Sequence, residues 1–124
     1  MSSSRSTQEL GQHGETLAAA ALTERGYTIL ERNWRCSTGE IDIVALHDGE
    51  LVIVEVRTRR GAASYDRALE SINTKKQEKL FVLAEIYQSE HDDLELSGIR
   101  IDVVIVSVGR DGTFVNIFPG AVGW

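Results

Sequence analysis

The chain has 124 residues, of which 42% are hydrophobic and 26% are charged, as expected for one soluble globular domain. Its net charge of −6 argues against indiscriminate binding to nucleic acid, and its apolar stretches are too short for a membrane-spanning helix. A single cysteine, Cys36, cannot form an internal disulfide, which favours a reducing, cytoplasmic location.

The chain begins with a polar tail, residues 1–7, which lacks the apolar core of a signal peptide. A helix is predicted from about Thr7 to Arg25, because apolar residues recur at helical spacing and Gly26 can end it. Its apolar stripe comprises Leu10, Gly14, Leu17 and Ala21, widened by Ala18 and Leu22. The two glycines inside the helix weaken it but permit another element to approach closely.

Three strands are predicted to follow this helix. The first covers residues 27–35, and the next two form a hairpin over residues 39–47 and 50–58. The Asp48-Gly49 pair between two β-branched runs is a strong signal for a tight hairpin turn.

One more helix and two more strands are predicted in the second half of the chain. The helix has Thr74 as its N-cap and extends to about Tyr87 or Gln88. The other segments are a loop over residues 59–66, a helical turn over 68–72, an acidic loop over 89–97, strands over 99–108 and 113–118, and a C-terminal tail over 119–124. This order favours one α/β domain, residues 8–118, with a mixed central β-sheet flanked by α-helices.

Acidic residues lie where the hairpin should carry apolar ones. If the turn lies at residues 48–49, Asp42 lies directly opposite Glu55. Glu40 then lies opposite Arg57, and all four side chains share one face of the sheet. Like charges directly opposite each other destabilise a hairpin. Because a bound cation would remove this repulsion, the Asp42–Glu55 pair predicts a metal site.

The oxygen atoms of this pair indicate which chemistry it supports. Mg²⁺ and Mn²⁺ prefer carboxylate and carbonyl oxygens, so Asp42, Glu55 and the carbonyl of Val56 are the candidate ligands. Arg57 shares the face of Glu55 and would point toward a phosphate held by the same ion. This set suits metal-assisted phosphodiester hydrolysis, which needs a cation and a fixed positive charge beside the developing negative charge.

Structural explanations stay open for the same residues. Glu40, a candidate outer ligand, could instead form a plain cross-strand ion pair with Arg57. Asp42 and Glu55 could be exposed at a sheet edge, where charges discourage aggregation. A single lysine such as Lys76 usually extends its stem along apolar surface and keeps its ammonium group in water.

Basic residues are concentrated in residues 57–79, which carry a net charge of +4 in an acidic chain. Such a segment could guide one polyanion to one place, whereas the plain explanation is a solvated arginine-rich loop and helix face. Outside this segment, Asp102 interrupts a strand that is otherwise apolar, and it is expected to pair with Arg100 or another arginine.

Several motifs together closely resemble the YraN-like family of small bacterial proteins. They are Gly14-Glu15, residues 26–33, Gly39-Glu40-Ile41-Asp42, residues 54–59, Lys76-Gln77 and Asp102-Val103-Val104. The match covers nearly the whole chain. It implies the restriction-endonuclease-like fold, PD-(D/E)XK, of proteins similar to Holliday-junction resolvases, which generally work as dimers.

The resemblance also implies roles for individual residues. The implied catalytic residues are Asp42, Glu55, Arg57, Glu15 and Gln77, with Mg²⁺ or Mn²⁺ held by the first two. The superfamily pattern has lysine where this chain has Arg57, and arginine stays charged and cannot act as a base. Arginine still binds phosphate in a bidentate manner. Lys76 is a candidate for the missing lysine if it reaches the site.

The favoured function is that of a cytoplasmic, divalent-metal-dependent endonuclease-like protein that acts on or binds structured DNA, such as branched DNA. Arg57, Arg59, Arg60 and Lys76 would contact the phosphate backbone, and no membrane is involved. One alternative is a module that has lost catalysis and binds nucleic acid or a protein partner. Another is a structural protein without a nucleic-acid role, which would suit the acidic net charge.

Overall fold

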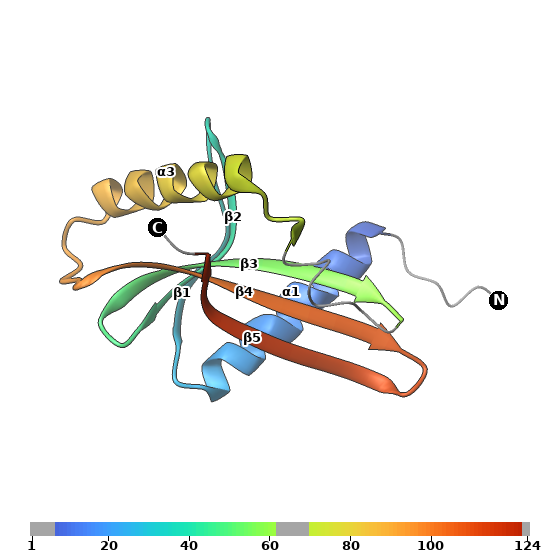
Figure 1. Ribbon diagram of the computed structural model, residues 1–124. Helices are drawn as coiled ribbons and strands as arrows, with labels where there is room; N and C mark the ends of the chain where they lie inside the picture. Colours follow the sequence, from blue (N-terminus) through green and yellow to red (C-terminus); the bar gives the residue numbers. More distant parts are fainter. Residues whose placement is uncertain (1–6, 62–69, 123–124) are drawn as a thin grey trace.

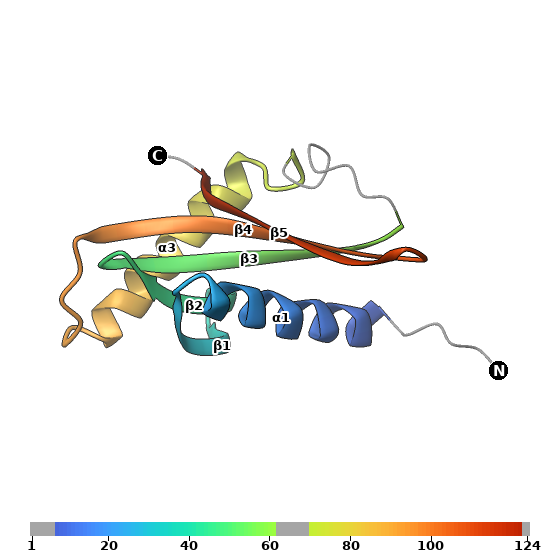
Figure 2. The ribbon, with the colours of Figure 1, turned by 90° about the horizontal axis from the view of Figure 1, so that it is seen from below.

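The computed structural model describes residues 7–61 and 70–122. Its five-stranded sheet lies between two helices, with α1 (Thr7–Glu24) on one face and α3 (Thr74–Glu90) on the other (Figures 1 and 2). The strands are β1 (Thr28–Cys36), β2 (Gly39–His47), β3 (Glu50–Arg60), β4 (Gly98–Gly109) and β5 (Gly112–Val122), adjacent in that order. The predicted α/β domain with a helix-flanked sheet is confirmed.

The sheet is mixed, as predicted. The pairs β1–β2, β2–β3 and β4–β5 are antiparallel, and β3–β4 is parallel. A parallel pair needs a crossover connection, and the segment between β3 and β4 contains α3. Within the described residues, neither helix has the length and apolar character needed to cross a membrane.

Helix α1 packs on β3 along one row of buried residues. Gly14, Ala18 and Leu22 are buried at a spacing of four residues, so they form one row along the helix. A methyl group at Gly14 would overlap the side chain of Thr58, whereas one at Gly11 would meet nothing within 4 Å. The close approach predicted from the glycines is therefore present at Gly14 alone. It brings the neighbouring side chain, Glu15, close to the sheet.

The hairpin turn between β2 and β3 has the predicted form. Asp48 and Gly49 have φ angles of 52° and 78°, the positive values that a two-residue type I′ turn requires. The predicted register holds from His47–Glu50 to Ile43–Val54. Its continuation toward the start of β2 does not hold.

Strand β2 rotates away from β3 at Asp42. Ile43 packs with the core cluster under α1, but Ile41 packs with the cluster under α3, although residues two apart normally share a face. Opposite this irregularity, Asn33 of β1 has a left-handed φ of 54°. Beyond it, β2 follows β1, with Ile41 paired to Trp34. Figure 1 shows this end of β2 rising out of the sheet.

The predicted pairing of Glu40 with Arg57 is consequently wrong. Glu40 is the register partner of Arg35, and its carboxylate lies 3.0 Å from the Arg35 Nε atom in an exposed ion pair. At this point β2 is paired with β1 and no longer with β3, so Glu40 lies beside Arg35 and does not face Arg57.

Some predicted boundaries also differ from the structure. The N-cap of α3 is Asn73 and not Thr74, because the Asn73 side chain accepts the Lys76 N–H at 2.9 Å. Strand β3 continues to Arg60, and β5 continues through Pro119 to Val122, where a tail was predicted. Residues 1–6, 62–69 and 123–124, with most of the predicted loop over 59–66, lie outside the described residues.

Candidate functional site

Three carboxylates from three elements meet where β2 leaves β3. They belong to Glu15 of α1, Asp42 of β2 and Glu55 of β3. Asp42 and Glu55 lie close enough to interact through their charges and, when one of them is protonated, through a hydrogen bond, and Glu15 lies close enough to both to affect them electrostatically. The structure therefore brings together the pair that the hairpin register predicted, although the strand ladder ends one residue earlier.

The backbone of β3 positions Asp42. The Val56 N–H donates to Asp42 Oδ2 at 2.9 Å, so the carboxylate takes the place that a strand partner would have had. The N–H and C=O of one strand residue point to the same side, so the Val56 carbonyl is directed toward the side that β2 leaves open. Val56 thus stays a candidate for the third oxygen ligand.

Burial and neighbouring negative charge raise the pKa of two of the three carboxylates, Asp42 and Glu15. The pKa of Asp42 is raised to about 7, first by burial and then by the neighbouring charge of Glu55, against the opposing effect of the Val56 hydrogen bond. Burial also raises the pKa of Glu15, although a hydrogen bond from Asn33 and the charge of Arg32 oppose this shift. Groups in this state bind a proton or another cation readily.

Two cations lie on one oxygen of Glu55. The Arg57 NH2 atom is 3.1 Å from Glu55 Oε2, and the Lys76 Nζ atom is 3.5 Å from the same oxygen. The Glu55 side chain is only 6% exposed. Lys76 therefore reaches the site from the first turn of α3, which is the condition that sequence analysis set for it.

Among the residues that the structure describes, two buried polar atoms at the site have no hydrogen-bond partner, namely Glu15 Oε1 and Arg57 Nε. A buried polar atom without a partner is costly, and native proteins keep few of them. Both side chains line a cavity of about 160 Å³. Its walls are Leu10, Gly11, Glu15, Val56, Arg57, Thr58 and Arg59. The cavity is therefore lined by one carboxylic acid, Glu15, and two arginines, Arg57 and Arg59, next to the Asp42–Glu55 pair.

Other predicted residues take different positions. The Gln77 side-chain amide donates to the Ile72 carbonyl at 3.0 Å, a bond that fixes the start of α3 and does not involve the carboxylates. One N–H of Arg59 donates to the Thr58 carbonyl at 3.2 Å, and Arg60 is exposed. Arg67 of the basic segment lies outside the described residues.

The fit of a divalent cation depends on how many ligands the chain must supply. Over residues 7–61 and 70–122, no three His, Cys, Asp or Glu side chains are arranged to hold a metal ion. Mg²⁺ needs only one or two carboxylates, with water and substrate phosphate completing its shell. The Asp42–Glu55 pair and the unpartnered Glu15 Oε1 atom fit that pattern.

Sequence analysis missed Asn33. This residue contacts Glu15 and adopts the left-handed conformation opposite the point where β2 turns away. An asparagine inside a strand was the available signal, because asparagine is depleted in strands and tolerates positive φ better than most residues.

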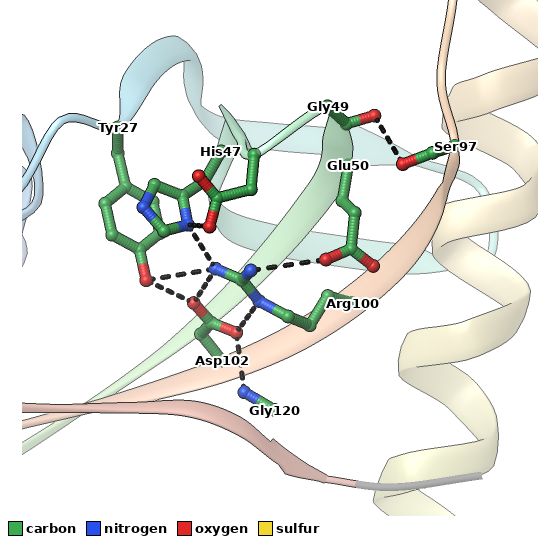
Figure 3. A network of polar contacts seen from close by, with 9 residues as sticks. Tyr27, His47, Gly49, Glu50, Ser97, Arg100, Asp102 and Gly120 are labelled. Carbon is green, nitrogen blue, oxygen red and sulfur yellow. Dashed lines mark hydrogen bonds and ion pairs between the residues drawn. The ribbon is translucent and has the colours of Figure 1, made fainter.

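A second polar cluster surrounds Asp102 near the other end of β3 (Figure 3). Arg100 donates to Asp102 from Nε at 2.8 Å and from NH2 at 2.9 Å, which confirms the predicted pairing. Tyr27 and the Gly120 N–H also donate to Asp102, at 2.6 and 2.8 Å. Arg100 further contacts Glu50 at 3.3 Å and His47 at 2.9 Å, while the His47 ring stacks on Tyr27.

Comparison with known proteins gives a consistent family match. A profile described as "Uncharacterised protein family UPF0102" matches residues 14–106. A UPF0102 protein of Roseiflexus castenholzii is 52% identical over 108 residues, which cover 87% of this chain and 86% of the relative. One from Clavibacter michiganensis is 48% identical over 105 residues, covering 85% and 87% of the two chains. One from Chloroflexus aurantiacus is 46% identical over 109 residues, covering 88% and 87%.

Proposed function

The chain belongs to the uncharacterised protein family UPF0102, and we propose that it is a divalent-metal-dependent endonuclease-like protein that acts on structured DNA in the cytoplasm. The observation that carries the proposal is the meeting of Glu15, Asp42 and Glu55 at the fork between β2 and β3. Folding alone gives no reason to gather like charges there, whereas cation binding does. The order of elements around the site also supports the PD-(D/E)XK fold.

Asp42 and Glu55 would hold Mg²⁺ or Mn²⁺, with the Val56 carbonyl as a third oxygen and Glu15 as an outer ligand. When bound, such an ion polarises a phosphoryl oxygen and lowers the pKa of an attached water. The residues around the pair would bind and orient a phosphodiester. Arg57 carries its guanidinium next to Glu55, where it can hold a phosphate and balance its developing charge.

Phosphodiester hydrolysis ends with a proton on the leaving oxygen. Arg57 cannot give up a proton at neutral pH, but the Lys76 ammonium can. Lys76 lies 3.5 Å from Glu55, so it is in reach of a substrate bound to that carboxylate. We therefore assign the proton-donating role to Lys76 and the phosphate-holding role to Arg57.

The test is a Mn²⁺ and Mg²⁺ titration of the pure protein with branched and linear DNA, followed by gel assays of both retention and nicking. Metal-dependent nicking that Asp42→Ala and Glu55→Ala abolish is the expected result. Glu40→Ala is the matched control, because Glu40 is an acidic residue of the same hairpin that binds Arg35 outside the site. Sedimentation of the same samples tests the dimer that the family resemblance predicts.

A non-catalytic DNA-binding module is the second candidate function. Arg57 in place of a lysine favours it, because both cations at Glu55 could serve phosphate binding alone. This function predicts salt-sensitive DNA retention without nicking in either metal. A protein that neither retains nor nicks DNA at low salt would contradict both functions.

A further inference from the structure

The face of the sheet that carries Glu55 continues across β3, β4 and β5 in three rows of paired residues. The rows are Glu55–Val103–Phe118, Arg57–Ile105–Asn116 and Arg59–Ser107–Phe114. Paired residues of adjacent strands point to the same face, so each row runs from the carboxylate strand to the outer strand β5. The last row lies toward the β4–β5 turn, which extends beyond α3 (Figures 1 and 2).

The two aromatic residues of these rows lie in different surroundings. Phe118, in the first row, packs against the core cluster beneath α3. Phe114, in the third row, has 56% of its surface exposed, more than the other large exposed apolar residues of the described chain, Leu30 and Val82. One exposed apolar side chain is ordinary by itself. The neighbours of Phe114 in its row make it informative.

Ser107 separates Phe114 from Arg59, and it is only 6% exposed. Its hydroxyl makes no hydrogen bond within the described structure. A buried hydroxyl without a hydrogen-bond partner is destabilising unless a bound molecule supplies that partner. The row thus combines an aromatic ring, an unsatisfied hydrogen-bonding group and an arginine position, in that order toward β3.

This combination suits a nucleobase better than a protein side chain. Proteins that bind single-stranded nucleic acid place aromatic rings for base stacking beside cations that follow the phosphates. Phe114 supplies the ring, and Arg57 and Arg59 supply cations on β3, the strand that bears Glu55. Glu55 and Phe114 are separated by four residues along the strand direction and by two spacings between neighbouring strands. These separations place Phe114 about 16 Å from Glu55, a distance that a few nucleotides of one strand span.

We propose that Phe114 stacks on an unpaired base of the bound nucleic acid, so that the preferred substrate carries a single-stranded segment beside a duplex. This inference rests on the proposed function and adds the substrate class. A base in a continuous duplex is already stacked and cannot lie on Phe114 without unpairing. The ring therefore distinguishes branched, flapped or overhanging DNA from blunt duplex.

The test compares two DNA probes, a blunt duplex and the same duplex with a single-stranded overhang that contains 2-aminopurine. Binding is measured by fluorescence anisotropy at low salt with a chelator present, so that no metal-dependent cleavage intervenes. The wild-type protein should bind the overhang probe about five- to a hundredfold more tightly, the range expected for stacking of one base. Stacking should also quench 2-aminopurine at one overhang position.

Phe114→Ala should remove both the preference and the quenching while leaving blunt-duplex affinity unchanged, and Phe114→Trp should retain them. Val82→Ala is the matched control, because Val82 is 47% exposed on α3 and lies outside the rows. Arg59→Gln should weaken binding to both probes alike and reduce the salt dependence. Equal binding of both probes by wild type and Phe114→Ala would overturn the stacking proposal alone. Failure of wild type to bind either probe would overturn the proposed function as well.

Discussion

The two charged clusters beside β3 have the same formal net charge, but their cations and carboxylates are arranged in opposite ways. Near the start of the strand, Arg100 lies between Asp102 and Glu50, and four donors occupy the two oxygens of Asp102. Near its end, Lys76 and Arg57 both contact one oxygen of Glu55. The carboxylates of Asp42 and Glu15 are left facing Glu55 with a raised pKa.

This difference distinguishes a cluster whose charges are matched internally from the cluster that we propose as a ligand site. Asp102 is fully buried, and its lone pairs are matched by the N–H and O–H groups around it. The fork at Asp42 instead keeps two buried polar atoms, on Glu15 and Arg57, that have no partner within the described part of the chain. Charge counting from the sequence cannot distinguish these cases, because the distinction lies in which atoms meet.

The largest expected effect is at Asp102. Asp102→Ala deprives the Arg100 guanidinium, the Tyr27 hydroxyl and the Gly120 N–H of a shared acceptor that is fully buried, so it should reduce the free energy of unfolding by about 3–5 kcal/mol. Urea denaturation followed by circular dichroism measures this loss. The matched control is Asp48→Asn in the adjacent turn, which removes a charge from a side chain that is 76% exposed, tolerates the same positive φ and should cost less than about 1 kcal/mol.

The glycines of α1 give the next largest contrast. Gly14→Ala places a methyl group against Thr58, so it should push α1 from β3 and reduce stability by about 1–3 kcal/mol despite the better helix propensity of alanine. Gly11→Ala meets nothing and should stabilise the protein by up to about 1 kcal/mol. Thermal denaturation of the pair tests this. Because Glu15 follows Gly14, only Gly14→Ala should also weaken Mn²⁺ binding, and equal effects of the two variants would contradict the packing argument.

Much of the fold was predictable because local signals agreed with the tertiary structure. The Asp48-Gly49 turn has no good alternative to a tight hairpin, and it set the register as far as Ile43–Val54. That register stops being informative at Asp42, since the rotation of β2 depends on packing and on the left-handed Asn33. Glu40 was therefore misplaced, while Asp42 and Glu55 still meet.

The environment of each site residue was less predictable than its identity. Lys76 was a candidate only on the condition that α3 began close to Glu55, and no sequence pattern gives that distance. Gln77 follows Lys76 directly, but one residue turns a helix by about 100°, so its amide meets the Ile72 carbonyl instead. The N-cap is Asn73 and not Thr74, because the side-chain oxygen of Asn73 accepts the Lys76 N–H.

The raised pKa of Asp42 gives a prediction of opposite sign to that for Asp102. The folded metal-free chain binds this proton more tightly than the unfolded chain, whose Asp42 has the ordinary pKa of 3.8. The associated stability is complete below that value and is lost as the pH rises through about 7. Near pH 8, Asp42→Asn should thus be more stable than wild type by about 1–2 kcal/mol, since asparagine is never charged.

Chemical denaturation in the presence of a chelator, repeated from acidic to alkaline pH, measures this difference. The advantage of Asp42→Asn should shrink as the pH falls toward about 5, because wild-type Asp42 then carries its proton. Glu40→Gln, in the exposed ion pair with Arg35, should show no such pH dependence. An Asp42→Asn variant that is less stable than wild type at alkaline pH would mean that the fork is a stabilising cluster like that of Asp102.

The smallest expected effect is that of Lys76 on metal affinity. It shows whether Lys76 competes with a metal ion for Glu55 or helps Glu55 to bind the ion. The Lys76 ammonium occupies the Glu55 oxygen that a cation would take, and its side chain is 35% exposed, so the pair is worth less than about 1 kcal/mol. Lys76→Gln should therefore tighten Mn²⁺ binding about two- to fivefold by calorimetry while slowing any cleavage. Lys79→Gln removes the same charge from α3 without touching Glu55 and controls for the general field. If Lys76→Gln instead weakened Mn²⁺ binding, Lys76 would be holding Glu55 in position for the metal ion. The charges of the fork would then be matched among its own residues, as they are in the Asp102 cluster.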